Sequence, residues 1–244
     1  MSGPRKEFLA ERDDLFVVHD FLSPEECDYY TTMSESVGFG DAPISTMSGP
    51  VMRKDIRNND RVMIDDPHIA KTIWERLKGF FPERVGFWVP VGLNERWRFY
   101  RYDPGQQFDW HFDGAYERSP LERSAFTFMI YLNGGVAGGA TEFNMRSRGG
   151  VQNDDPIVRV QPEAGKALVF PHRIYHRGAP VADGRKYVMR TDVMCPGRNR
   201  RGELCRVNRS GARTTGPDAV RVVPRSERVR CSRLAPSASQ LGAW

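Results

Sequence analysis

The stretch RWRFYRYDPGQQFDWHFDG, residues 96–114, decides how this chain is interpreted. It holds two strand-like runs, 96–102 and 108–114, and the Asp-Pro-Gly between them is typical of a turn. Alternate residues of a strand point to the same side, so His111 and Asp113 project from one face of the second run. One imidazole and one carboxylate therefore converge on a single point.

Further strand-like runs follow, separated by clusters of Gly, Asn, Asp or Pro; they cover 124–133, 141–145, 157–161, 166–171 and 186–194. A succession of strands without intervening helices favours a sandwich, a barrel or a jelly roll. The fold class predicted from this part of the chain is therefore mainly β.

Helices are predicted ahead of these strands. After a short strand over 15–22, Ser23-Pro24-Glu25-Glu26 combines an N-cap, a proline in the first turn and a capping-box glutamate, which predicts a helix to about Ser36. Residues 37–62 have the composition of a loop. Asp66-Pro67 opens a second helix, which Phe81-Pro82 ends.

A second histidine, His176, follows the run at 166–171. Two histidines and one carboxylate on one face of an ion leave positions open for a bidentate co-substrate and O₂, as in non-haem iron(II) oxygenases. Taken singly, the His-x-Asp pair also fits a surface turn, and His176 fits a structural role. Lys186 begins a later run and shares a strand face with Arg190 and Asp192; a cation inside a β-core requires an anion, either a dicarboxylate or an internal acid.

Three segments in order resemble the prolyl 4-hydroxylase-like family of iron(II)- and 2-oxoglutarate-dependent dioxygenases. They are YDPGQQFDWHFDG, TFMIYLNGGVAGGATEF and HRGAPVADGRKYVMRTDV, and the resemblance covers about residues 94–194. It implies a double-stranded β-helix, which is a jelly roll with the metal at its mouth. It also implies site roles for six residues: iron ligands His111, Asp113 and His176, and co-substrate residues Lys186, Tyr102 and Thr127. Arg190, as a second cation on the strand face of Lys186, is a further candidate for binding the same anion, and Lys186 ranks first.

The reaction that the resemblance implies uses Fe²⁺, 2-oxoglutarate and O₂, with ascorbate as a candidate reductant. It hydroxylates an unactivated C–H bond and releases succinate and CO₂. The substrate is expected to be a prolyl or other peptidyl residue, or a small molecule. Candidate substrate residues are Asn58 and Arg61 in the loop before the second helix, and Arg98 and Tyr100 on the strand at 96–102. The loop residues also fit a solvated turn.

Other functions stay open at this point. A cupin-like metalloprotein would share the fold but would not use 2-oxoglutarate, and a binding protein could keep a degenerate site. A nucleic-acid demethylase is suggested by the tail from residue 198 onward, which holds eleven arginines and three acids. The spacing of Lys186 disfavours that reading, and nucleic acid is not the expected partner. A zinc site from Cys195, Cys205 and Cys231 lacks the usual close cysteine pair.

The bulk composition suits a globular protein, with 39% hydrophobic and 27% charged residues. The tail carries a net charge of +8, which leaves −3 for the first 197 residues because the whole chain carries +5. We expect residues 1–197 to form the oxygenase domain, with helical support over 1–93 and the jelly-roll core over 94–197. Residues 198–244 read as a disordered tail. No long apolar run or secretory leader is present, which predicts a cytoplasmic protein without a membrane partner; the oligomeric state is left open.

Overall fold

The computed structural model describes residues 3–46, 48–146, 150–152 and 154–197, together with the backbone of 206–207 and 213–214. The helices are α1 (Pro24–Val37), α2 (Pro67–Leu77) and the short 3-10 helix η1 (Lys78–Phe80). The strands before and between the helices are β1 (Arg5–Leu9), β2 (Arg12–His19), β3 (Gly40–Asp41), β4 (Ile44–Thr46), β5 (Gly49–Val51) and β6 (Asp60–Asp65).

The later strands form most of the β structure. They are β7 (Gly92–Leu93), β8 (Arg96–Tyr102), β9 (Phe108–His111), β10 (Glu117–Ser119), β11 (Glu122–Tyr131), β12 (Ala137–Gly138), β13 (Thr141–Asn144), β14 (Ile157–Val160), β15 (Ala167–Pro171), β16 (Tyr175–Gly178), β17 (Val181–Asp183), β18 (Lys186–Pro196), β19 (Arg206–Val207) and β20 (Arg213–Thr214).

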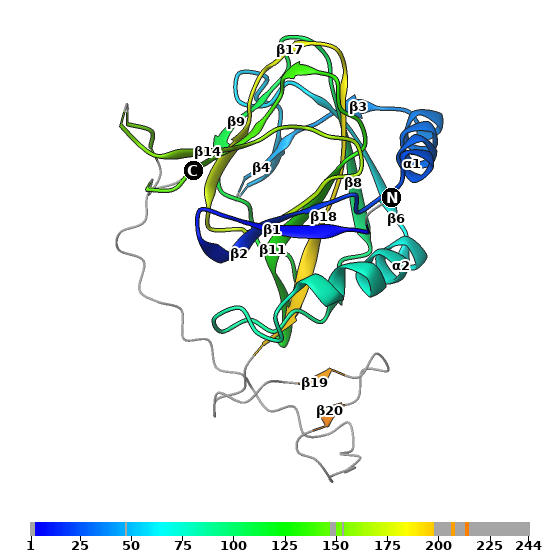
Figure 1. Cartoon of the computed structure of the whole chain (residues 1–244), viewed down its shortest axis with the longest axis vertical. Coiled ribbons are helices and arrows are strands. Elements are labelled where there is room, and N and C mark those ends of the chain that lie inside the picture. Colours follow the sequence, from blue (N-terminus) through cyan, green and yellow to red (C-terminus); the bar gives the residue numbers. More distant parts are fainter. Residues whose placement is uncertain are drawn as a thin grey trace.

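A large sheet and a small sheet face each other. The large sheet runs in the order β1-β2-β15-β11-β18-β8-β6-β3; off this path, β10 pairs with β11 and β7 pairs with β18. The small sheet runs β14-β13-β16-β9. A buried cluster holds residues of both sheets, among them Tyr100, Met129 and Val188 from the large sheet and Phe143 and Val160 from the small one. This two-layered β architecture agrees with the predicted jelly roll (Figure 1).

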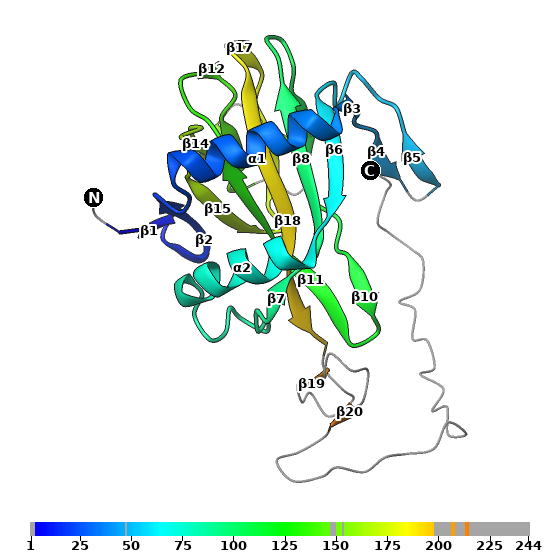
Figure 2. The same cartoon turned by 90° about the vertical axis from the view of Figure 1, so that its right-hand side faces the viewer.

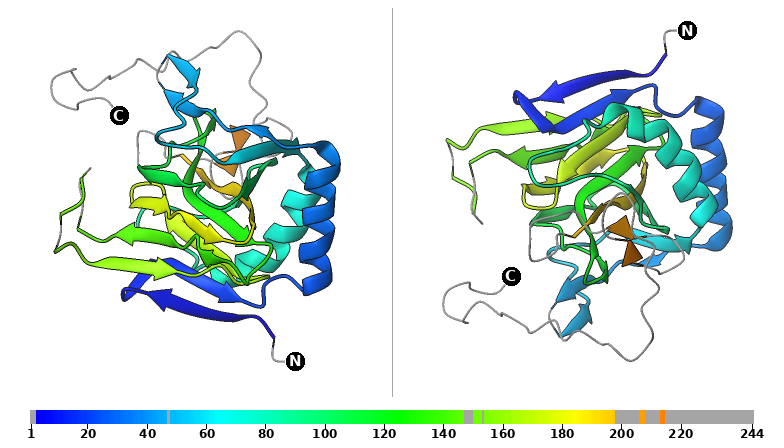
Figure 3. Two further views of the ribbon diagram at one scale, coloured as in Figure 1. Left: turned by 90° about the horizontal axis from the view of Figure 1, so that it is seen from above. Right: turned by 90° about the horizontal axis from the view of Figure 1, so that it is seen from below.

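Both helices lie across the outer face of the large sheet (Figure 2; Figure 3 shows the same layering along another axis). Trp97 and Phe99 on β8 point to this side and pack in one cluster with Ile73 and Leu77 of α2. Their neighbours Tyr100 and Tyr102 belong to the opposite cluster, as the alternation in β8 predicts. Burial of a large apolar side chain such as Trp97 contributes about 1.5–3 kcal/mol, so β8 is fixed firmly between the two clusters.

The helix starts follow from their local sequences. The Ser23 hydroxyl accepts from the backbone N–H of Glu26, whose carboxylate accepts from the N–H of Ser23, so the predicted capping box is present. Asp66 caps α2 in a similar way, with its carboxylate accepting from the N–H groups of His68 and Ile69. The first predicted helix is confirmed, ending one residue later than expected at Val37. The second starts as predicted, but α2 ends at Leu77 and only the 3-10 helix η1 carries the helical segment on to Phe80.

The chain ahead of residue 94 contributes more than helices. β2 inserts into the large sheet beside β15, and β6 pairs along β8 from Asp60 to Asp65. Residues 37–62, predicted as a loop, contain β3, β4, β5 and the start of β6. β3 and β6 form through pairing with more distant segments, which local composition does not reveal, whereas β4 and β5 pair with each other in a local hairpin. The proposed division at residues 93 and 94 stays a prediction, and the predicted disorder of the tail concerns residues that lie almost entirely outside the described ones.

Candidate active site

The two predicted histidines are direct cross-strand partners. His111 ends β9 and His176 lies opposite it on β16, so both imidazoles leave the small sheet on the same face. Their ring centroids are 4.2 Å apart. Asp113 follows beyond the end of β9, where its backbone N–H donates to the carbonyl oxygen of His172 (3.1 Å). Strand register and one backbone hydrogen bond thus bring the three side chains together.

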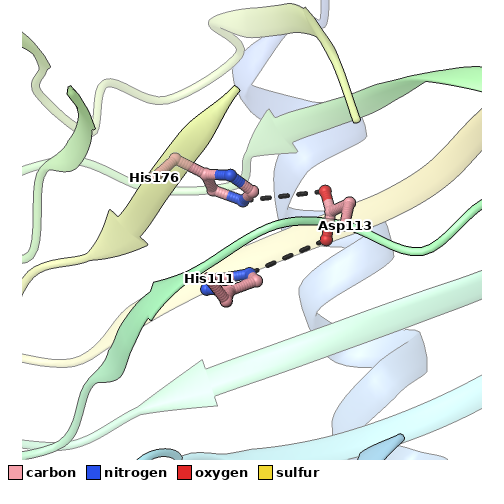
Figure 4. Close-up of side chains that lie close together, drawn as sticks. All are labelled: His111, Asp113 and His176. Carbon is pink, nitrogen blue, oxygen red and sulfur yellow. Dashed lines mark ion pairs between the residues drawn. The ribbon is translucent and has the colours of Figure 1, made fainter. Parts of the chain in front are cut away.

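The carboxylate of Asp113 lies between the two imidazoles (Figure 4). Nε2 of His111 is 3.7 Å from Oδ1, and Nε2 of His176 is 3.6 Å from Oδ2. These separations exceed hydrogen-bond lengths. One ligand atom from each of the three residues lies within 4.8 Å of the others, which is close enough for all three to coordinate a single ion.

Both imidazoles are oriented for coordination by their second nitrogen. Nδ1 of His111 lies 2.7 Å from the carbonyl oxygen of Asp109, and Nδ1 of His176 lies 2.9 Å from that of Ile174. A carbonyl oxygen can only accept, so each Nδ1 carries a proton and each Nε2 is the nitrogen that faces Asp113. Burial, and then the adjacent His111, lower the pKa of His176 to about 3, which keeps the ring neutral. A metal requires this state of its histidine ligands.

The carboxylate of Asp113 is fixed through Oδ2. The hydroxyl of Thr127 donates to this oxygen, and Nη2 of Arg190 lies 2.8 Å from it. Burial alone raises the pKa of Asp113, but the charge of Arg190 holds it well below its usual value. The carboxylate is therefore charged, with Oδ1 directed at His111. One charged carboxylate and two imidazoles match the donor set that non-haem iron(II) uses.

A chain of hydrogen bonds runs from Asp113 into the core. Because the Thr127 hydroxyl donates to Asp113, it accepts from Nδ1 of His172 (3.0 Å). Nε2 of His172 then accepts from Ser124 (2.9 Å), whose oxygen accepts from the N–H of Tyr116 (2.8 Å). His172 is buried, which lowers its pKa and favours the neutral ring. A neutral ring is required here, because Nδ1 donates to Thr127 while Nε2 accepts from Ser124. Thr127 was predicted near the co-substrate; the structure shows it bonded to the candidate metal carboxylate.

A cavity lies beside the two candidate histidine ligands, and Lys186 contributes to its lining. The lining includes Tyr100, Tyr102, His111, His176, Lys186 and Arg190. The side chain of Lys186 is only 2% exposed, and its ammonium donates to the carbonyl oxygen of Gly139 (2.8 Å). Within the residues that the structure describes, no carboxylate pairs with it, so the internal acids Asp192 and Glu142 are not its partners. Burial lowers the pKa of Lys186 to about 7.

Space for an anion remains beside this ammonium. A Cβ added to Gly178 would lie 3.9 Å from Nζ of Lys186 and 3.7 Å from the hydroxyl of Tyr102. The absence of a side chain there therefore leaves the ammonium and the phenol open to the same small volume. Burial raises the pKa of Tyr102 to about 12, so it stays a hydrogen-bond donor. This arrangement fits the distal carboxylate of 2-oxoglutarate, which would accept from both groups.

The structure also places the remaining predicted residues. Arg190 lines the cavity, but its guanidinium already meets the carboxylate of Asp113. Arg98 pairs with Asp192 (3.1 Å), and Tyr100 lines the cavity. The carboxamide oxygen of Asn58 accepts from the N–H of Gln107 (2.7 Å), so this side chain ties its loop to the segment before β9. Arg61 lies on β6 opposite Tyr100.

Several residues that form the site were not among the predicted site residues. Arg57 packs its guanidinium between the rings of Tyr100 and Phe108, at 4.6 and 4.4 Å from their centroids. The glycines beside Lys186 and the hydroxyl of Ser124 were likewise not assigned. Gly178 could have been predicted, because it lies two residues after His176 in the same strand and therefore faces the same side. No local signal marks Arg57, because its position depends on a bridge to Phe108.

Comparison with known proteins identifies sequence relatives. Residues 97–191 match the family described as the 2OG-Fe(II) oxygenase superfamily. Prolyl 4-hydroxylase 1 of Arabidopsis thaliana is 25% identical over 204 residues, which cover 77% of this chain and 71% of the relative. A PKHD-type hydroxylase of Alteromonas mediterranea is 23% identical and covers 70% of this chain and 74% of the relative. The chain spans 66% of prolyl 4-hydroxylase 2 of Arabidopsis thaliana.

Solved structures share the fold. A prolyl-4-hydroxylase from Pseudomonas putida superposes with a TM-score of 0.54 at 15% identity, covering 78% of this chain and 92% of that one. A Trichoplax adhaerens prolyl hydroxylase, solved with a hypoxia inducible factor peptide fragment, gives 0.57 at 16% identity and covers 74% of this chain and 84% of that one. The resemblance supports the jelly-roll assignment.

The fold, the family match and the clustered His-Asp-His donors define a non-haem iron(II)- and 2-oxoglutarate-dependent oxygenase. The family match over residues 97–191, the sequence relatives and the structural neighbours together support a prolyl 4-hydroxylase-like 2OG-Fe(II) oxygenase. Its cofactor chemistry is accordingly that of Fe²⁺, 2-oxoglutarate and O₂, and a cupin-like protein without 2-oxoglutarate is set aside. Among the described residues, no helix is long and apolar enough to cross a membrane.

Proposed function

We propose that this chain hydroxylates an unactivated C–H bond, with iron(II) held by His111, Asp113 and His176 and with 2-oxoglutarate held by Lys186 and Tyr102. When bound, the metal and the co-substrate supply the oxidising power, and 2-oxoglutarate leaves as succinate and CO₂. The protein's own residues orient the reactants and exclude water around the reacting C–H bond.

One observation carries the proposal: a buried ammonium, which has no acidic partner in the described part of the chain, opens into the cavity that the two candidate histidine ligands line. A buried cation is costly unless it meets an anion. A dicarboxylate that binds Lys186 at one end can reach the metal ligands with the other end. Phe108 stacks on His111 with ring centroids 3.6 Å apart, which shields one side of the imidazole from water.

The decisive experiment is an anaerobic titration of the protein with iron(II) and 2-oxoglutarate, followed by visible absorption. We expect a weak metal-to-ligand charge-transfer band that saturates with 2-oxoglutarate. Lys186→Met should weaken 2-oxoglutarate binding at least tenfold, since a charge-assisted bond is lost. The control Lys54→Met changes a lysine that is 67% exposed and should bind normally. No band, or equal affinity in the two variants, would contradict the proposal.

The substrate class is the finer part of the proposal. The sequence relatives named as prolyl 4-hydroxylases support peptides containing proline as the first candidates, and free small molecules remain the second class. Succinate formation without substrate gives the background rate. A candidate that raises this rate and gains one oxygen in mass is a substrate. The nucleic-acid alternative depends on the tail, most of which lies outside the described residues.

A further inference from the structure

Arginines gather on one side of the cavity. Arg61 lies opposite Tyr100 in the β6–β8 register, and Arg98 lies opposite Arg190 in the β8–β18 register. Directly opposed residues of neighbouring strands project to the same face. Tyr100 and Arg190 both line the cavity, so the two other arginines lie on its face of the sheet. Arg57 joins this group through its contact with the ring of Tyr100.

Arg57 is buried without full satisfaction of its hydrogen bonds. It is 4% exposed, and its guanidinium is packed between the rings of Tyr100 and Phe108. Its Nε donates to Oδ1 of Asn59 (2.9 Å), but Nη2 has no hydrogen-bond partner within the described part of the chain. A buried donor without an acceptor destabilises the folded protein. An acceptor brought by a ligand would remove this destabilisation.

The positive charges of this group exceed the negative charges that face them. Arg190 pairs with Asp113, and Arg98 pairs with Asp192. Within the residues that the structure describes, Arg57 and Arg61 form no ion pair. Metal binding to Asp113 would increase the imbalance, because part of its charge would then neutralise the ion.

The positive charge of these arginines also shifts the pKa values of Tyr100 and Arg61. Burial alone raises the pKa of Tyr100, yet Arg190, Arg57 and Arg98 lower it to about 8. The pKa of Arg61 is lowered by burial and further by the same three arginines. A cluster of like charges is stabilised when an anion joins it.

The arginine group is separate from the proposed co-substrate anchor. Arg61 lies two strands across and two residues along the sheet from Lys186, which is roughly 12 Å between backbones. Arg61 therefore sits toward the margin of the sheet formed by β6 and β3, away from Lys186. A second acid can occupy this side while 2-oxoglutarate occupies the other.

We propose that the substrate carries a carboxylate and that Arg61 and Arg57 bind this carboxylate at the β6 side of the cavity. The proposal rests on the proposed oxygenase function and specifies its substrate. The partly exposed guanidinium of Arg61 can bind a carboxylate through two parallel hydrogen bonds. Arg57 would add a hydrogen bond from its unpaired Nη2. The carboxylate belongs either to a free acid or to an acidic side chain of a peptide.

Anaerobic calorimetry on the protein loaded with iron(II) and 2-oxoglutarate tests this proposal by heat of binding, without turnover. The first probe pair is N-acetyl-L-proline and N-acetyl-L-prolinamide. The second is the blocked peptide Glu-Pro-Gly and its Gln-Pro-Gly counterpart. We expect at least one acid to bind tenfold or more tightly than its neutral partner. Preference in the first pair assigns a free acid, and preference in the second assigns a peptide carboxylate.

Variants then connect the preference to the arginines. Arg61→Gln should reduce the preference for the acid to below about threefold, and Arg61→Lys should retain part of it, because the charge remains. Arg53→Gln, at an exposed arginine paired with Asp55, should keep the full preference. Equal binding of acids and amides by the unmodified protein, or a full preference in Arg61→Gln, would overturn the inference. If iron and 2-oxoglutarate bind in the same titrations, such a result leaves the proposed function intact; if they do not bind, the proposed function itself fails.

Discussion

Nη2 of Arg190 lies 2.8 Å from Oδ2 of Asp113, so a guanidinium on the large sheet holds a carboxylate that follows the small sheet. The two layers of the sandwich are thereby connected at the candidate metal centre. Because Oδ2 is engaged by Arg190 and Thr127, the carboxylate presents its other oxygen to an incoming ion. The first two predictions concern this arrangement.

Replacing Arg190 by Gln should weaken iron(II) binding by about 10–100-fold, the usual effect of losing an outer contact to a metal ligand. The cause is loss of orientation of Asp113. Titration with iron(II) under anaerobic conditions measures the change, and circular dichroism checks the fold. Arg96→Gln, which removes an exposed pair with Asp65 on the same sheet, serves as control. Unchanged iron affinity in Arg190→Gln would show that Asp113 is held by other means.

Thr127→Val should also lower metal affinity, by about tenfold, because Asp113 loses a donor and His172 loses its acceptor. Thr127→Ser keeps the hydroxyl and should restore most of the affinity. The comparison isolates the hydroxyl, since Val preserves the shape of Thr. Two variants with the same affinity would mean that packing, and not the hydrogen bonds, is what matters at this position.

The affinity for 2-oxoglutarate should depend on pH through Lys186. Burial places the pKa of this ammonium at about 7 in the free protein, and a bound carboxylate raises it. The charged form binds, so affinity should be level below pH 7. Above pH 7 it should fall by up to tenfold for each pH unit. Lys186→Arg should abolish the dependence, because arginine stays charged. Dissociation constants measured anaerobically from pH 6 to 9 test this; a level profile in the unmodified protein would refute it.

Gly178→Ala should raise the dissociation constant for 2-oxoglutarate by about tenfold while leaving thermal stability nearly unchanged. The added methyl group would make ordinary van der Waals contacts with Tyr102 and Lys186, so the fold tolerates it. It would nevertheless fill the volume assigned to the distal carboxylate. Gly40→Ala, where the added carbon meets nothing within 4 Å, is the matched control. Normal binding by Gly178→Ala would place the co-substrate elsewhere.

A chain ending at Gly197 should retain iron and 2-oxoglutarate binding, as the proposed domain boundary requires. β18 ends at Pro196, and the N–H of Gly197 donates to the carbonyl oxygen of Leu121 (2.6 Å). All of the candidate ligands precede this point. Loss of both activities in a folded truncated chain would show that residues 198–244 belong to the functional unit.

The sequence predicted those parts of the site that depend on local geometry. The alternation in 96–102 matches β8, and the i, i+2 relation of His111 and Asp113 places both at the cavity. β16 was missed because Tyr-His-Arg-Gly has no apolar alternation, although it carries His176. Arg57 was not singled out from its loop either: it reaches the cavity because it bridges to Phe108 on β9, a contact between distant parts of the chain.

Because His111 and His176 are direct cross-strand partners, metal binding depends on the correct pairing of β9 with β16. A slip of one residue between β9 and β16 would turn one imidazole to the other face of the small sheet. A misaligned chain would therefore offer at most two ligands and bind the ion poorly. Because iron binds tightly only when β9 and β16 pair in the correct register, it stabilises this register over pairings shifted by one residue.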